Sequence, residues 1–154
     1  MRRLIVDTNL LLLLVVGSTA DGLIQKHKRT RTFTPQDLAL LERFLGGFND
    51  IVVTPGILAE VSNLSAQIGE PLRSSIMQTV GRLVAQIRED HVPGISVIES
   101  RCFIRLGLVD ASILEACQEG DHLLTDDLDL WIEAVNSGKT ATNFTHLRAE
   151  HLLS

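Results

Sequence analysis

The stretch Leu4-Ile5-Val6-Asp7-Thr8-Asn9 governs the interpretation of the rest of the chain. Its three apolar residues, two of them β-branched, are typical of a short strand buried on both faces inside a parallel sheet. The carboxylate of Asp7 follows this strand at its C-terminal end, which is the edge of an open α/β sheet where ligands bind. Asp is also a favoured N-cap residue, so Asp7 taken alone would be interpreted as the cap of the next helix. A functional role for Asp7 therefore depends on whether other acids follow other strands.

The composition is that of an ordinary globular protein. The chain has 154 residues, 45% of them hydrophobic and 21% charged, which suits a single domain over residues 1–154. Two cysteines are too few for a disulfide scaffold, so a cytoplasmic location is expected. No CxxC or HExxH motif supports a zinc site. The net charge of −5 weighs against a nucleic-acid partner, although cations bound by clustered acids would offset it locally.

The N-terminal segment has some features of a secretory signal. Arg2 and Arg3 precede an apolar run from Leu10 to Val16, and small residues follow it. The run is too short to span a bilayer, and polar residues 7–9 interrupt the apolar stretch. We therefore expect a folded strand and helix here and no association with a membrane.

Hydrophobic periodicity predicts that strands and helices alternate along the chain. Besides the first strand, strands are expected at 51–53, 95–98, 122–125 and, at the edge of the sheet, 141–144. Helices are expected at 10–16, 34–45, 54–68, from 71 to near 93, 108–119 and 128–135, with 18–33 a loop or irregular helix. This alternation predicts an α/β fold, namely a three-layer α/β/α sandwich with a mainly parallel central sheet.

The position of an acid around its helix distinguishes acids that point to solvent from acids that are turned towards the core. On the helix 108–119, Asp110 falls on the flank of the buried stripe, whereas Glu115 and Glu119 point away from it. A carboxylate turned towards a core is costly unless it is paired or binds a metal, although an acid in a first turn also suits the helix dipole. Glu60 lies beside the buried stripe of its helix, and its phase alone favours a surface position.

A third group of acids, Asp126, Asp127 and Asp129, follows the strand 122–125. One of them is expected to cap the next helix, but three acids in four residues exceed what a cap needs, and their repulsion requires compensation. Together with Asp7 and Asp110 they fall where strands end or helices begin. Clustered carboxylates suit Mg²⁺ or Mn²⁺, ions that activate water and stabilise a phosphoryl transition state. The predicted chemistry is hydrolysis of a phosphodiester or phosphoester.

Four motifs, taken together, resemble the PIN-domain nucleases. They are Val6-Asp7-Thr8-Asn9, Thr54-Pro55-Gly56-Ile57-Leu58-Ala59-Glu60-Val61, Leu106-Gly107-Leu108-Val109-Asp110-Ala111-Ser112-Ile113 and Leu124-Thr125-Asp126-Asp127-Leu128-Asp129-Leu130. They follow the order of the family over nearly the whole chain. The resemblance implies a PIN-like fold and a metal-dependent endoribonuclease, in which an acidic site binds Mg²⁺ or Mn²⁺ and hydrolyses RNA.

The resemblance also implies a role for each matching position. The implied catalytic acids are Asp7, Glu60, Asp110 and Asp127. The implied metal ligands are Asp7, Asp110 and Asp127, with Asp129 as a more variable fifth acid; which of Asp126, Asp127 and Asp129 binds metal stays open. The polar residues that would support ligands or hold water are Thr8, Asn9 and Thr125.

The partners follow from the same resemblance. Many bacterial proteins of this size and type are toxins of VapC-like toxin–antitoxin pairs, often homodimers inhibited by a small antitoxin. We therefore expect an RNA substrate, a cognate antitoxin and a homodimer. Outside the shared motifs, the one concentrated basic cluster is the best candidate for phosphate contact, although such clusters are usually solvated surface; it contains Lys26, Lys28, Arg29 and Arg31.

Three other interpretations are weighed against the nuclease. A haloacid-dehalogenase-like phosphatase also uses an Asp after its first strand, but it would need a second acid where this chain has Asn9. A phosphoacceptor receiver domain would need a lysine after a late strand, and Lys139 is the candidate. A non-catalytic PIN-like binding or assembly module would carry the same acids only as caps and solvated charges.

Overall fold

A computed structural model describes all 154 residues and shows an α/β fold around a five-stranded sheet. The strands are β1 (Arg3–Val6), β2 (Asp50–Val53), β3 (Arg88–Glu89), β4 (His122–Thr125) and β5 (Thr140–Asn143). Every neighbouring pair is parallel, and the strand order is β3-β2-β1-β4-β5. In the central register Ile5 of β1 lies between Val52 of β2 and Leu123 of β4.

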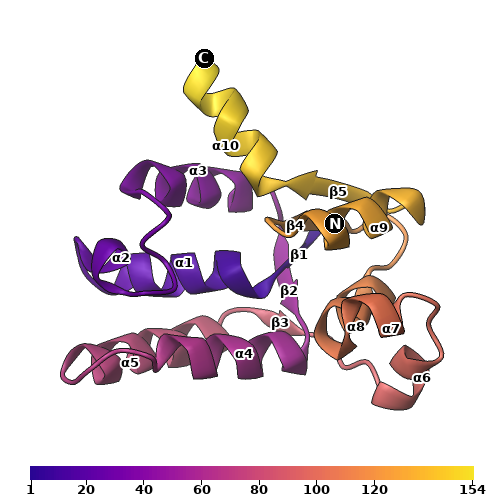
Figure 1. Cartoon of the computed structure of the whole chain (residues 1–154), viewed down its shortest axis with the longest axis horizontal. Helices are drawn as coiled ribbons and strands as arrows, with labels where there is room; N and C mark the ends of the chain where they lie inside the picture. Colours follow the sequence, from indigo (N-terminus) through magenta and orange to yellow (C-terminus); the bar gives the residue numbers. More distant parts are fainter.

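Helices cover both faces of this sheet (Figure 1). One layer consists of α1 (Thr8–Thr19), α2 (Leu23–Lys26), α3 (Pro35–Leu45), α4 (Pro55–Ser65) and α5 (Leu72–Val84). The other layer consists of α6 (Gly94–Ile98), α7 (Phe103–Leu106), α8 (Leu108–Ala116) and α9 (Leu128–Asn136). The last helix, α10 (Phe144–Leu153), projects outward beyond β5. The predicted three-layer α/β/α class with a parallel central sheet is confirmed.

The hydrophobic core is centred on β1 and α1. Leu4, Ile5 and Val6 are fully buried because β1 has a strand on each side and helices over both faces. Helix α1 is apolar on nearly every side because it contacts α2, α3, α4 and α5. Gly17 allows the close approach of α1 and α3, since a Cβ at this position would lie 2.6 Å from Cδ2 of Leu38.

Two of the predicted elements are wrong. Residues 95–98 form helix α6 rather than a strand; Pro93 precedes it as N-cap, and Val97 is buried whereas Ile95 and Ile98 are exposed. The third strand is instead β3, which lies in the segment expected to continue the preceding helix. Helix α5 ends at Val84, before that strand. A run such as 95–98 is ambiguous because a short apolar segment fits a strand or a buried helical turn equally well.

The C-terminal helix α10 was not expected from the periodicity. It begins where the side chain of Asn143, at the end of β5, accepts hydrogen bonds from the N–H groups of Thr145 and His146, at 2.9 and 3.2 Å. Only Phe144 of this helix is fully buried, so its apolar signal is weak. Because the apolar periodicity of residues 144–153 is weak, the sequence of this region predicts only the edge strand at 141–144.

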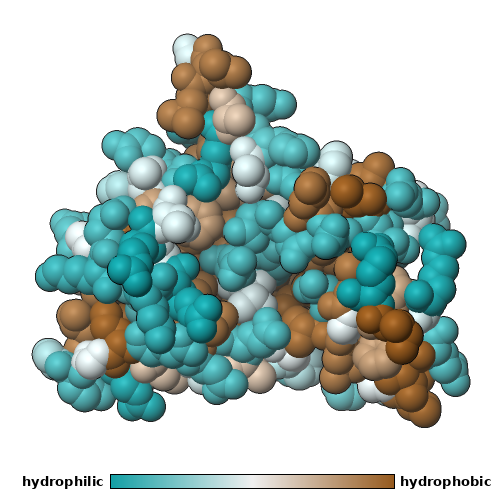
Figure 2. Space-filling view, viewed as in Figure 1, coloured by the Kyte–Doolittle hydropathy of each residue, from teal (hydrophilic) through white to brown (hydrophobic).

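No helix of the structure combines the length and apolar character that crossing a bilayer requires. Exposed apolar side chains gather instead on α6, on α9 and at the end of α10 (Figure 2). They belong to Ile95, Ile98, Leu128, Ile132, Val135, Leu152 and Leu153.

Candidate functional site

The strand order places the ends of β1 and β4 together. From β1 the chain proceeds through β2 and β3 on one side, and then returns to add β4 and β5 on the other side. The crevice at the carboxyl ends of two strands where the order reverses is the usual ligand site of an open α/β sheet. Asp7 follows β1 and Asp126 follows β4, so the predicted acids lie at this switch point.

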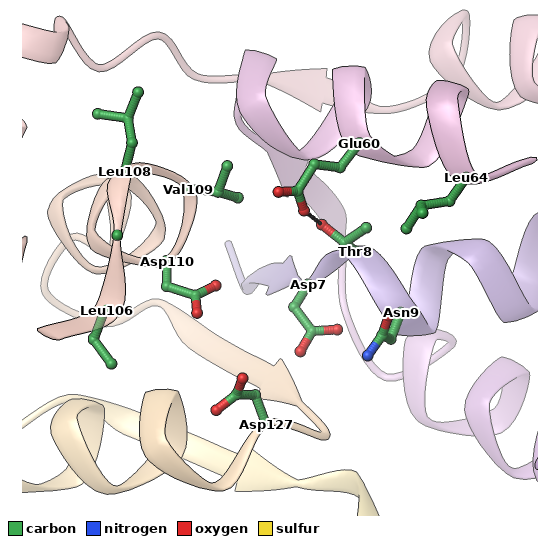
Figure 3. A pocket seen from close by; sticks show the side chains of 11 residues that line it. Asp7, Thr8, Asn9, Glu60, Leu64, Leu106, Leu108, Val109, Asp110 and Asp127 are labelled. Carbon is green, nitrogen blue, oxygen red and sulfur yellow. Dashed lines mark hydrogen bonds between the residues drawn. The ribbon is translucent and has the colours of Figure 1, made fainter. Parts of the chain in front are cut away.

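A pocket of about 370 Å³ lies at this edge and brings together four of the predicted acids (Figure 3). Asp7 comes from the N-cap of α1, Glu60 from α4, Asp110 from the first turn of α8 and Asp127 from the N-cap of α9. Thr8 and Asn9 also line the pocket, and its apolar rim is formed by Leu64, Leu106, Leu108 and Val109. No Lys, Arg or His lines it.

Asp7 is a helix cap and a site residue at once. Its Oδ1 accepts a hydrogen bond from the N–H of Leu10 at 3.3 Å, and its Oδ2 accepts from the Thr125 hydroxyl and from the N–H of Asp126 at 3.2 Å. The carboxylate is buried, with 5% of the residue exposed. Burial first, and the nearby Asp126 carboxylate second, raise the pKa of Asp7 from 3.8 to about 8. The capping interpretation of Asp7 is thus confirmed, and the same carboxylate also lines the pocket.

Thr125 connects the two strand ends. Besides donating its hydroxyl hydrogen to Asp7, its oxygen accepts a hydrogen bond from the N–H of Asp127 at 3.0 Å. Asp127 caps α9 by accepting from the N–H of Leu130 at 3.0 Å, and its side chain faces the centre of the pocket in Figure 3. The supporting role expected of Thr125 therefore has a definite geometry, although Thr125 itself does not line the pocket.

Asp110 lies opposite Asp7 and Asp127, on α8 (Figure 3). Gly107 precedes the helix with φ +85°, a value that favours glycine, and this turn delivers Asp110 to the first turn of α8. Burial, followed by the charges of Asp127 and Glu60, raises the pKa of Asp110 from 3.8 to about 6. Its half-buried position agrees with the helical phase, which placed it on the flank of the apolar stripe.

Glu60 is exposed, as its phase predicts, but it stands at the rim of the pocket. The Thr8 hydroxyl donates a hydrogen bond to Oε2 of Glu60 at 2.9 Å, which joins the start of α1 to α4. Helical phase indicates only which residues of α4 face the hydrophobic core. It could not predict a role for Glu60, because the pocket lies beside α4 and not on its core-facing side. Only the motif resemblance singled out Glu60.

The other two acids after β4 have different surroundings. Asp126 accepts a hydrogen bond from Nδ2 of Asn9 at 3.3 Å, and burial raises its pKa, but its side chain is not part of the pocket lining. Asp129 is exposed in the first turn of α9 and does not reach the pocket. Of the acids at 126, 127 and 129, only Asp127 lines the pocket, whereas the Asp126 carboxylate lies near Asp7 without being part of that lining.

The predicted basic cluster is not brought to the pocket. Helix α1 has 12 residues, about 18 Å of helix, and Asp7 lies at its start whereas α2 and the basic cluster follow its end (Figure 1). The side chains of the cluster are exposed, although His27 and Thr30 between them are buried. Arg29 also donates a hydrogen bond from Nε to Oε1 of Gln67, at 2.8 Å. The four basic side chains therefore lie outside the lining of the acidic pocket.

Lys139 does not support the receiver-domain alternative. Its Nζ donates to the carbonyl oxygen of Cys117 at 3.0 Å, and the next residue, Thr140, pairs with His122 at the start of β4. Lys139 is therefore at the opposite end of the strands from Asp7. A phosphoacceptor site would need this lysine beside the acids.

The donor set of the pocket fits a hydrated hard cation. All its charged groups are carboxylates, and the buried Asp7 has no cationic side chain beside it in the pocket. As they stand, no three His, Cys, Asp or Glu side chains form a group that could hold an ion directly. Mg²⁺ keeps several of its water ligands and binds through one or two carboxylates, so acids spaced around a pocket of this size suit it.

Comparisons with known proteins give no family for this chain. No protein-family model matches the sequence, and no curated protein matches it. Among solved structures the chain is similar to a domain of a functionally unknown protein from Methanocaldococcus jannaschii, with 19% sequence identity and a TM-score of 0.47. That similarity covers 93% of this chain and 91% of the other.

Proposed function

We propose that this protein is a metal-dependent endoribonuclease that hydrolyses RNA phosphodiester bonds at the acidic pocket. The observation that carries the proposal is the convergence of Asp7, Glu60, Asp110 and Asp127, from four separate segments, on one pocket without a basic side chain. Repulsion between neighbouring carboxylates makes it costly for all of them to be ionised. A bound divalent cation would offset that repulsion. The pattern resembles that of PIN-domain nucleases.

Each residue of the acidic pocket would have a distinct role in hydrolysis. Asp7, Asp110 and Asp127 would hold Mg²⁺ or Mn²⁺, while Thr125 orients Asp7 and Thr8 orients Glu60 through hydrogen bonds. Bound there, the cation would supply an activated water and stabilise the charge of the phosphoryl transition state. Glu60, which lines the pocket and accepts a hydrogen bond from Thr8, would accept a proton from a water that enters the pocket.

The phosphatase alternative is less well supported. It would require a second acid at the position of Asn9, whose side-chain amide instead donates a hydrogen bond to Asp126. Hydrolysis by an activated water needs no second acid at the position of Asn9.

The biological setting is proposed from the resemblance alone. A toxin of a VapC-like pair would act in the cytoplasm, would be a homodimer and would be inhibited by a cognate antitoxin. Lys26, Lys28, Arg29 and Arg31 would contact phosphates of the RNA remote from the cut. Co-expression with the product of a neighbouring gene, followed by recovery of an inactive complex, would test the antitoxin proposal.

One experiment separates the nuclease from a non-catalytic binding module. Mixed RNA is incubated with the protein in Mn²⁺, in Mg²⁺ and in EDTA, alongside Asp7→Asn. Asp129→Asn is the matched control, because it makes the same change at an exposed acid outside the pocket. We expect metal-dependent cleavage by the wild type and by Asp129→Asn but not by Asp7→Asn. Equal cleavage by all three proteins, or none by the wild type with either metal, would reject the proposal.

A further inference from the structure

A second, mostly apolar pocket adjoins the acidic one. It has a volume of about 140 Å³ and shares Leu108 and Val109 with the acidic pocket, so these two side chains form a common wall. Its other sides come from the start of α4, with Pro55 and Gly56, and from the loop after β3, with His91 and Val92. None of its lining residues carries a carboxylate.

Glycine keeps part of this second pocket open. A Cβ on Gly56 would lie 3.4 Å from Cγ2 of Val109 and would occupy space beside the common wall. Ser112, one turn along α8 from Leu108, also lines the pocket with a small side chain, and its hydroxyl donates to the carbonyl of Leu108 at 2.6 Å. With that hydrogen already used, the Ser112 hydroxyl can only accept a hydrogen bond from a ligand. The cavity therefore suits a flat apolar ring.

We propose that this second pocket binds the base of an unpaired nucleotide next to the phosphodiester that is cut. The inference rests on the proposed nuclease function, because the occupant is identified by what the acidic pocket would hold. When a phosphodiester occupies the acidic pocket, the bases on either side are the nearest flat apolar groups of the substrate. Among the lining residues, His91 has the kind of aromatic ring on which proteins stack single-stranded bases.

This placement specifies the substrate class. A base in the second pocket must leave its helical stack and its pairing partner, so duplex RNA cannot place a base there without being opened. The enzyme would therefore cut single-stranded or looped RNA. Stacking of a base contributes about 1–3 kcal/mol, which corresponds to a fivefold to hundredfold change in affinity and is tolerant of sequence. A preference for ring size is expected, and strict sequence specificity is not.

The first test does not depend on cleavage. Adenosine and cytidine, which lack phosphate, are titrated into the metal-free protein, and backbone amide shifts are recorded by NMR. We expect saturable shifts confined to residues 54–56, 91–94 and 108–112, which Ser112→Met abolishes and Ser112→Ala preserves. Ser75→Met is the matched control, since Ser75 on α5 is exposed and also bonds the carbonyl four residues before it. The inference is overturned if no saturable shifts appear, which is the result expected of a pocket that binds a protein partner. Shifts confined to other residues would also overturn it.

The second test uses cleavage and separates the inference from the proposed function. A short RNA is made with a single abasic nucleotide at each position in turn. We expect cleavage to fall about tenfold when the abasic position lies at one fixed side of the cut. The Ser112→Met variant should cleave intact RNA about tenfold more slowly than the wild type does. On the RNA that is abasic at this position, the variant and the wild type should cleave equally. If neither the abasic nucleotide nor Ser112→Met alters cleavage, the proposed base binding is wrong but the proposed nuclease function stands. If the wild type cleaves no RNA, the proposed nuclease function itself is wrong.

Discussion

The hydroxyl of Thr125, at the end of β4, donates a hydrogen bond to the buried carboxylate of Asp7, at the end of β1. The two residues are 118 positions apart in the sequence and meet because β1 and β4 are neighbours. The same hydroxyl oxygen accepts the N–H of Asp127, so one side chain fixes the positions of two acids of the pocket. Orientation of site carboxylates by such partners is typical of metal centres.

Replacement of Thr125 by the isosteric Val should destabilise the protein by about 1–3 kcal/mol, because it leaves a buried carboxylate without one of its donors. The pKa of Asp7 should rise further, since the Thr125 hydrogen bond lowers it. Urea unfolding at pH 8 in EDTA measures the change. Thr140→Val, at the exposed first residue of β5, is the control and should differ little from the wild type. Equal stabilities of the two variants would show that the Thr125 bond contributes nothing.

Asp127→Asn tests which acid after β4 would hold the proposed metal. Asn is as good an N-cap as Asp, so α9 and the fold should be retained. Loss of a group that only orients a ligand costs 10–100-fold, so loss of a ligand itself should reduce RNA cleavage by at least about a hundredfold. The stabilisation of the protein by Mn²⁺ in thermal melts should fall with it. Asp126→Asn and Asp129→Asn are the controls; if either matches or exceeds the loss, Asp127 is not the ligand.

Much of the fold can be predicted from the sequence because buried parallel strands and amphipathic helices have distinct apolar periods. The strands at β1, β2 and β4 are continuous apolar runs, and Thr34 and Thr54 mark the starts of α3 and α4 as N-caps. Strand β3 could not be predicted in this way. It is two exposed residues long, and backbone pairing with β2 makes it a strand without any apolar pattern.

The site is predictable in part for the same reason. The local pattern singles out Asp7, Asp110 and the acids 126–129 only together, because they all fall where strands end or helices begin. Asp7 alone fits a helix cap, and only the motif resemblance selects Asp127 from its group. Glu60 gives no such signal, because what brings it to the pocket is the packing of α4 beside α1. The position of the basic cluster is likewise a tertiary property: nothing local reveals that α1 carries it away from Asp7.

The metal-free protein should lose stability as the pH rises from 5 to 8. The folded-state pKa of Asp7, about 8, lies above its ordinary value of 3.8, and that of Asp110 is raised to about 6. In this interval the native state binds more protons than the unfolded state, so the stabilisation present at low pH is lost as each native carboxyl ionises. Thermal melts in EDTA at pH 5, 6.5 and 8 should show a falling midpoint. Asp7→Asn should flatten most of the fall, and a slope unchanged by this substitution would contradict the assignment.

Neutralising the basic cluster should weaken RNA binding without altering the chemistry. With Lys26, Lys28, Arg29 and Arg31 all changed to Gln, each phosphate contact that is lost should reduce the slope of log affinity against log salt by about 0.7 for single-stranded RNA. Because none of the four side chains lines the acidic pocket, cleavage of an RNA too short to reach the cluster should be unchanged. Fluorescence anisotropy at several salt concentrations measures the slope. Arg73→Gln with Arg82→Gln, at two exposed arginines of α5, is the control for net charge. If the quadruple variant keeps the wild-type slope on long RNA, the cluster is a solvated surface and the RNA takes another path from the pocket.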